Sequence, residues 1–196
     1  NLISNDSNGA AVDNIFKTDY YSKQKGPWFD LFSKEVLKEF SMWFMKMHKA
    51  DQFVVEESWY QIYNKNNFHE LHTHSGTNFT NVFYLQLPTN NSSTFIDDKH
   101  IDAKEGDLIS FPGFIPHESK PNLHDKPKII ISFNSSLKIN LVLSIVSSIT
   151  ESKLSRLTFD FKCLLVYFLA IIPITAPLLH IILKAPAIIL TPTTPL

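Results

Sequence analysis

Between Phe53 and Asn134 the sequence alternates polar and apolar residues, and this alternation limits the fold more than any other feature. Successive side chains of a strand point to opposite faces, so a period of two predicts half-buried β-structure. Turn-forming clusters separate the apolar runs. The predicted strands are Phe53–Val55, Ser58–Tyr63, Glu70–His74, Asn81–Leu87, Thr94–Ile96, Asp107–Phe111 and Lys128–Phe133. Many short strands without interleaved helices predict an antiparallel sandwich or an open barrel.

A helical pattern precedes the strands, from Asp30 to about Lys49. Apolar residues there recur mostly every three or four positions, which predicts one amphipathic helix packed against the sheet. The residues before it are polar and turn-rich, so we expect an extended arm or a short strand. The predicted organisation is an N-terminal arm over residues 1–28 and a β-rich domain with a leading helix over residues 29–134. With 44% hydrophobic residues, the 196-residue chain is long enough for one domain with its own core.

The composition changes abruptly after Asn134. Residues 135–196 form an apolar tail with few charges and no glycine, and residues 163–183 contain no Asp, Glu, Lys or Arg. That run is long enough to span a membrane, but Pro173 and Pro177 interrupt it. Three interpretations stay open: a membrane tail, an apolar helical layer on the barrel, or a segment foreign to the domain, such as translation past a frameshift.

The charge balance excludes some classes of partner. With 18 basic and 19 acidic residues, the net charge of -1 gives no general attraction to nucleic acid or to anionic membranes. The single cysteine, Cys163, excludes an internal disulfide. The first ten residues lack the basic-then-apolar pattern of a secretion signal. We therefore expect a cytoplasmic protein, with membrane contact through residues 163–183 as the alternative.

Three histidines have a spacing that suits a metal site. His72 and His74 are two apart in a predicted strand, so their side chains share one face. The later segment Gly106–His117 reads as a short apolar strand and a Pro-Gly turn that delivers His117. Three imidazoles suffice to bind a divalent transition metal and leave positions open. The alternative is that these histidines only decorate a solvated strand face. His69, an odd number of residues from His72, is predicted to point the other way.

Three stretches together resemble a known enzyme family: QIYNKNNFHELHTH, Gly106–His117, and KIIISFN near residue 130. They look like the iron and 2-oxoglutarate-dependent dioxygenases, in particular a short microbial and phage branch. The resemblance covers Ser58 to Asn134. It implies a mainly β fold, the double-stranded β-helix (a jelly-roll or cupin-like barrel), supported by the N-terminal helix. It also implies a hydroxylase that uses Fe(II), 2-oxoglutarate and molecular oxygen. The substrate is not readable from the sequence.

Carried over to this chain, the resemblance implies a set of metal ligands. His72 and His117 would ligate Fe(II), and His74 stands where the family usually has a carboxylate. The site is then one charge more positive than two histidines and one carboxylate would make it. A carboxylate from elsewhere, with Asp97 or Asp98 as candidates and Glu70 as a poorer one, could take the third position instead.

The resemblance also implies how the co-substrate is held. Tyr63 matches a tyrosine that hydrogen-bonds 2-oxoglutarate, and Gln61 stands where an asparagine often assists it. Lys128 falls where an arginine usually pairs with the distal carboxylate of the co-substrate. The positive charge survives this change, whereas the two-pronged hydrogen bonding of a guanidinium does not.

Two other classes remain open. Cupins share the barrel and the His-x-His strand, and Gly106, Pro112 and His117 fit the spacing of their second motif. Against this, Phe114 stands where a glycine is usual, and the glutamate expected after His74 is absent. Such a protein would bind metal, with or without catalysis, but not 2-oxoglutarate. The remaining class is a metal-free, non-catalytic barrel. Binding of metal and of 2-oxoglutarate separates the three.

Overall fold

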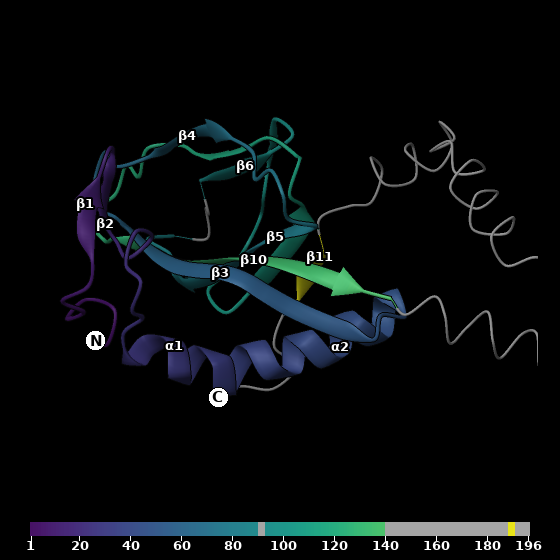
Figure 1. Ribbon diagram of the computed structural model, residues 1–196. Coiled ribbons are helices and arrows are strands. Elements are labelled where there is room, and N and C mark those ends of the chain that lie inside the picture. The colour runs from purple at the N-terminus through teal and green to yellow at the C-terminus, as the bar shows by residue number, and fades with distance from the viewer. Residues whose placement is uncertain (90–92, 140–187, 191–196) are drawn as a thin grey trace, which may run out of the picture. The chain divides into compact units, whose positions relative to one another are not determined.

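The computed structural model describes residues 1–89, 93–139 and 188–190 (Figure 1). One helical segment lies near the N-terminus, and the remaining elements are strands of two antiparallel sheets. The helical segment consists of α1 (Pro27–Phe32), the π-helical turn η1 (Ser33–Leu37) and α2 (Lys38–His48). The strands are β1 (Ala10–Val12), β2 (Ile15–Thr18), β3 (Gln52–Tyr63), β4 (His69–His72), β5 (Phe79–Gln86), β6 (Thr94–Ile96), β7 (Lys99–His100), β8 (Leu108–Pro112), β9 (His117–Ser119), β10 (Lys128–Lys138) and β11 (Ile188–Leu190).

The chain winds between the two sheets. The large sheet has the order β1-β2-β3-β10-β5-β8-β11, and the small sheet has the order β4-β9-β6-β7. From β3 to β10 the chain passes from the large sheet to the small one and back at every connection except that between β6 and β7. Paired strands that alternate between two facing antiparallel sheets make a double-stranded β-helix, the jelly-roll arrangement. The predicted fold class, a mainly β barrel of this type with a supporting N-terminal helix, is confirmed.

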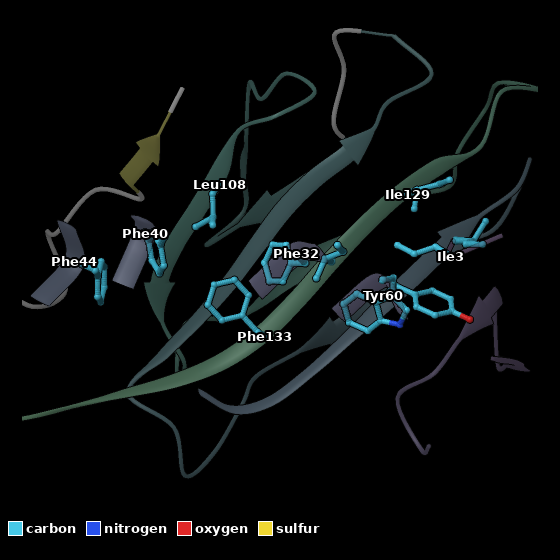
Figure 2. Packing of buried hydrophobic residues seen from close by; sticks show 11 residues of the cluster. Ile3, Phe32, Phe40, Phe44, Tyr60, Leu108, Ile129 and Phe133 are labelled. Carbon is cyan, nitrogen blue, oxygen red and sulfur yellow. The ribbon is translucent and has the colours of Figure 1, made fainter. Parts of the chain in front are cut away.

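The helical segment covers the outer face of the large sheet (Figure 1). Figure 2 shows Phe32, Phe40 and Phe44 of the helices packed with Tyr60 of β3 and Phe133 of β10 in one buried cluster. The Phe133 ring lies 5.7 Å from that of Phe32 and 5.8 Å from that of Phe40. Because side chains alternate along a strand, the neighbours of Tyr60 and Phe133 point to the opposite face, into the barrel. β3 and β10 thus supply core on one face and the candidate site on the other.

The helical segment begins three residues before the predicted start. Pro27 occupies its first turn, where a missing backbone N–H costs nothing. The segment ends where Lys49 adopts a left-handed conformation with φ of 53°, and the N–H of Ala50 donates to the Met45 carbonyl at 3.0 Å. The predicted end near Lys49 agrees with this stop.

Two strands that the alternation predicted separately are one. β3 runs unbroken through Glu56 and Glu57, whose exposed side chains interrupt the apolar pattern but not the backbone pairing with β10. The pairing absorbs the irregularity as a register shift between Asn134 and Ser135. β1 and β2, within the predicted arm over residues 1–28, form a hairpin that pairs with β3.

The end of β10 overlaps the predicted tail. β10 continues to Lys138, and β11 pairs antiparallel with β8. The rest of the tail, including the apolar run 163–183, lies outside the described residues. Among the described residues, no helix combines the length and the apolar character needed to cross a membrane.

Candidate functional site

The fold brings the three predicted metal-site histidines together. His72 on β4 and His117 on β9 are direct cross-strand neighbours, with ring centroids 4.2 Å apart. β4 ends at His72, so His74 lies beyond the strand that the sequence predicted for both. The His74 ring is nevertheless 5.1 Å from that of His72 and 5.0 Å from that of His117. One ligand atom from each residue lies within 4.8 Å of the others, so the three side chains could hold a metal ion.

Backbone contacts fix His74 although it is outside a strand. Its N–H donates to the carbonyl of Gly113 at 2.8 Å. A Cβ atom added to Gly113 would lie 2.9 Å from the carbonyl oxygen of His74 and 2.7 Å from the Thr77 side chain. The close approach of these two chain segments therefore requires glycine in the Pro112-Gly113 turn.

The hydrogen bonds of the three imidazoles select the tautomer that a metal ligand needs. Nδ1 of His72 lies 2.7 Å from the Glu70 carbonyl, and Nδ1 of His117 lies 3.0 Å from the Ile115 carbonyl. Nδ1 of His74 lies 2.6 Å from the side-chain oxygen of Asn134 on β10. Since carbonyl and amide oxygens only accept hydrogen bonds, each Nδ1 carries a proton, and Nε2 is the atom left to bind a metal.

Burial keeps two of these imidazoles neutral. It lowers the pKa of His117 to about 3, with a further decrease from the neighbouring His72. Burial also lowers the pKa of His72, an effect that the hydrogen bond to the Glu70 carbonyl partly offsets. Metal binding needs the unprotonated ring, so at neutral pH these groups are ready to bind without losing a proton. The donor set fits a divalent transition metal.

His69, which the sequence placed on the opposite face, lies beside the cluster. Its ring centroid is 4.0 Å from that of His72. The pairing of β4 with β9 shifts register between His69 and His72, and such an irregularity cancels the strict alternation of faces. The side-chain nitrogen of Gln61 lies 3.3 Å from Nδ1 of His69, which must accept this hydrogen bond. The remaining Nε2–H of His69 is therefore a donor and not a metal ligand.

A buried lysine, Lys128, lines the same barrel interior as the histidines. Lys128 is fully buried, and its ammonium donates to the hydroxyls of Ser119 at 2.8 Å and Thr94 at 3.0 Å. It also lies 5.3 Å from the ring centroid of Tyr63, its direct partner across β3 and β10. Burial lowers the pKa of Lys128 to about 7. No carboxylate of the described residues forms an ion pair with it, which is unusual for a fully buried lysine.

A narrow cavity of about 30 Å³ connects Lys128 with the histidines. Tyr63 and Gln61, the two residues that the resemblance assigns to the co-substrate, both line it. Burial raises the pKa of the Tyr63 hydroxyl, which therefore stays protonated at neutral pH. The cavity is lined by Trp59, Gln61, Tyr63, His69, His72, His74, Thr80, Val82, Thr94, His117, Glu118, Ser119, Lys128, Ile130 and Ser132. Its only carboxylate, on Glu118, forms an ion pair with Lys120 at 2.6 Å.

The carboxylates considered as alternative ligands are exposed. Asp97 and Asp98 form the exposed turn between β6 and β7, where Asp97 pairs with Lys99 at 3.8 Å. Glu70 is exposed on β4. Within the described ranges, the only group of three metal-binding side chains that lies close enough together is that of the three histidines. Of the other histidines, His48 ends α2 with its ring centroid 4.5 Å from that of Phe44, and His124 is exposed.

Several residues of the site were not predicted. The hydroxyls of Thr94 and Ser119 hold Lys128, and Asn134 holds His74. Asn134 is the last residue of the KIIISFN stretch. It is an even number of residues from Lys128 along β10, so the sequence already indicated that the two side chains share a face. For Thr94 and Ser119 the sequence offers no such signal, because they belong to short strands of the other sheet.

Comparison with known proteins gives structural similarity without sequence similarity. No protein-family model matches the chain, and no curated protein matches its sequence significantly. Among solved structures, a 2OG-Fe(II) oxygenase family oxidoreductase from Burkholderia pseudomallei is similar with a TM-score of 0.47 and 12% identity, over 58% of this chain and 57% of that one. A prolyl-4-hydroxylase from Pseudomonas putida is similar with a TM-score of 0.45 and 13% identity, over 63% of this chain and 71% of that one.

A cupin is also among the similar structures. An RmlC-like cupin protein from Desulfovibrio desulfuricans has a TM-score of 0.32 and 15% identity, over 44% of this chain and 84% of that one. For comparison, the match with the Burkholderia oxidoreductase covers little more than half the length of that protein. At such identities and TM-scores these similarities assign neither metal nor substrate, and both must be argued from the residues of the site.

Proposed function

We propose that the protein is a non-haem Fe(II) and 2-oxoglutarate-dependent hydroxylase, with its catalytic residues in the predicted domain over residues 29–134. The observation that carries the proposal is the buried ammonium of Lys128, which has no carboxylate partner among the described residues and lies at one end of a narrow cavity whose other end holds three imidazoles. A buried cation without a counter-charge is unfavourable, and an anionic ligand would offset its cost. A slender dicarboxylate that reaches from the histidines to Lys128 could bind the metal with one carboxylate and pair with the ammonium through the other.

The residues of this chain have distinct roles in the proposal. His72, His74 and His117 would hold the metal through Nε2, since their Nδ1 atoms are occupied by hydrogen bonds. Lys128 would bind the distal carboxylate of 2-oxoglutarate, assisted by the hydroxyl of Tyr63. Bound iron would supply the activation of molecular oxygen that leads to hydroxylation of a substrate, coupled to decarboxylation of 2-oxoglutarate.

The third histidine changes the charge of the site. With three neutral ligands, a divalent metal keeps its full double positive charge, whereas a carboxylate ligand would cancel half of it. The two carboxylates of 2-oxoglutarate offset this charge together with that of Lys128. The all-imidazole donor set therefore favours an anionic co-substrate more strongly than a set with one carboxylate would.

A second candidate is a cupin-type metal protein that works without 2-oxoglutarate. The observation in its favour is the donor set itself, because three histidines with an open position also suit zinc and other late transition metals. In that case Lys128 would bind a different anion or none.

An anaerobic titration of the full chain with Fe(II) and then 2-oxoglutarate tests the proposal. A chelated 2-oxoglutarate gives a weak visible charge-transfer band, which we expect for the parent protein. Lys128→Met should raise the 2-oxoglutarate concentration needed for the band by at least about tenfold, since a buried charge-assisted contact is lost. Lys126→Met, two residues away at an exposed position, is the matched control and should leave the titration unchanged.

Other outcomes point to the other classes. Bound iron without a band in the parent protein would refute 2-oxoglutarate binding and favour the cupin-type candidate. Failure to bind any divalent metal under the same conditions would leave a barrel without a metal function.

A further inference from the structure

A second, wider cavity of about 310 Å³ also reaches two of the three histidines, His72 and His74. The β1–β2 hairpin, the following residues Tyr20 and Tyr21, β3 and the segment after β4 form its walls. It is lined by Val12, Asp13, Ile15, Thr18, Tyr20, Tyr21, Glu57, Trp59, Gln61, His69, His72, Thr73, His74, Ser75 and Asn134. Because it reaches His72 and His74, it is the cavity through which a substrate would approach the site of the proposed function.

Aromatic rings lead from the mouth of this cavity to the histidines. The Tyr20 ring packs edge to face against Tyr21 at 4.9 Å and against Trp59 at 5.0 Å. Trp59 in turn stacks on His74 at 5.7 Å. Exposure falls along the series, from 76% for Tyr21 and 45% for Tyr20 to 5% for Trp59. Adjacent rings are nearly perpendicular, with interplanar angles of 75° and 78°, so they present ring faces in more than one direction.

The charge of the cavity lining is one-sided. Two carboxylates line it, those of Asp13 and Glu57, and no lysine of the described chain does. In the described parts of the chain neither carboxylate has a hydrogen-bond or ion-pair partner. The Glu57 carboxylate lies close enough to Tyr20 to add to the effect of burial in raising the pKa of its hydroxyl. The nearby lysine of the neighbouring groove, Lys25, is engaged by Asp19 at 3.6 Å.

We propose that this cavity binds an alkylammonium group of the substrate, held against the rings of Tyr20, Tyr21 and Trp59 and paired with Glu57. The inference rests on the proposed function in one respect: the bound cation is the substrate only if the histidine site is the proposed hydroxylase site. Ring faces attract organic cations through their quadrupole, and an unpaired carboxylate beside them adds a direct charge contact. A lining with carboxylates and no lysine disfavours an anionic substrate by the same physics. Asp13, on the β1–β2 turn, adds a second carboxylate to the lining and strengthens the preference.

The test compares choline with its neutral isostere, 3,3-dimethylbutan-1-ol, by calorimetric titration of the full chain under anaerobic conditions. Both probes have the same shape, so the difference in affinity measures the recognition of charge. We expect choline to bind at least about tenfold more tightly. N-acetyl-lysine methylamide, measured alongside, distinguishes a lysine side chain from a small quaternary amine as the natural source of the cation.

Two variants test the residues that carry the inference. Glu57→Gln removes the charge and keeps the shape, and Tyr21→Leu removes the most exposed ring; each should weaken choline binding about fivefold. Glu56→Gln is the matched control, because this neighbour does not line the cavity and its carboxylate accepts from Ser136 at 2.5 Å. Its choline affinity should equal that of the parent protein. Circular dichroism checks that all three variants fold.

Equal binding of choline and the isostere, or choline binding insensitive to both variants, would overturn the inference. The iron and 2-oxoglutarate titration is read separately from these affinities. A selective cation site without a charge-transfer band would refute the proposed function and keep the cation site. A band without any preference for choline would refute only the cation site.

Discussion

At the residue scale, the site depends on which atoms are protonated. Carbonyl and amide oxygens accept the Nδ1 protons of His72, His74 and His117. In His69 the tautomer is the opposite one, because Nδ1 accepts a hydrogen bond from the side-chain amide of Gln61. Four adjacent imidazoles are thereby divided into three candidate ligands and one donor. The protonation state of Lys128, in contrast, is not fixed by its hydrogen-bond partners. Burial brings its pKa to about 7, so the charged and neutral forms coexist near neutral pH.

The affinity for 2-oxoglutarate should therefore depend on pH through Lys128. Binding of a carboxylate needs the protonated ammonium, which in the free protein is half populated near pH 7 and is progressively lost as the pH rises above it. We expect the dissociation constant to rise by up to about tenfold per pH unit between pH 7 and pH 9. Calorimetric titration of the iron-loaded protein at several pH values measures this.

Lys128→Arg provides the control, because a guanidinium stays protonated throughout this range. Its dissociation constant, whatever its size, should be independent of pH. A pH-independent affinity in the parent protein, or the same pH dependence in both proteins, would contradict the assignment of Lys128 as the anchor.

At the scale of elements, each central strand of the large sheet serves two purposes. The outward side chains of β3 and β10 pack under the helices, and their inward side chains line the site. The helical segment therefore sets the position of the strands that carry Trp59 and Lys128 without touching the site itself. The small sheet contributes His72 and His117 from short paired strands, which the rest of the barrel must hold in place.

Removing one ring between the helix and the large sheet should destabilise the whole domain. Phe44 of α2 is fully buried and lies 4.9 Å from both Phe40 and Phe79. Phe44→Ala should lower the free energy of unfolding by about 3–5 kcal/mol, because it removes buried apolar surface and leaves a cavity. Met42→Ala, at a half-exposed position of the same helix, should change it by less than about 0.5 kcal/mol. Urea denaturation of both variants measures the difference, and equal effects would show that the helix does not pack as described.

At the scale of the whole molecule, the candidate metal site joins parts of the two sheets. His72 and His117 belong to the small sheet, whereas the ring of His74 is held by Asn134 of the large sheet. A metal bound by all three would connect the two sheets. An unfolded chain does not present the three rings together, so binding free energy would add to folding free energy.

Divalent metal should accordingly stabilise the protein. At a metal concentration about a hundred times the dissociation constant, the free energy of unfolding should rise by about 2.7 kcal/mol. Thermal unfolding with and without Fe(II), or Zn(II) as an air-stable substitute, measures this, and a chelator should reverse it. His117→Ala should abolish the effect, and His124→Ala, at an exposed position outside the cluster, should retain it. Equal stabilisation of both variants would mean that metal binds elsewhere.

The sequence by itself determined the kind of fold and indicated which three histidines lie together. Alternation over Phe53–Asn134 is a local property, because each strand must place its apolar side chains on one face, and it was enough to predict a β-barrel with a leading helix. The spacing of His72, His74 and His117 was informative for the same reason. The wrong details were also local: β3 is one strand, and His74 lies beyond the end of β4.

Only the tertiary structure decided which distant side chains meet. The hydroxyls that hold Lys128, the oxygen that orients His74 and the irregularity that turns His69 toward the cluster depend on pairing between strands far apart in sequence. The second cavity likewise combines Asp13 and Tyr21 of the N-terminal region with Glu57 and Trp59 of β3. Strand register and sheet packing set these contacts, and a linear pattern contains neither, because it records the face on which a side chain lies but not its partners across the barrel.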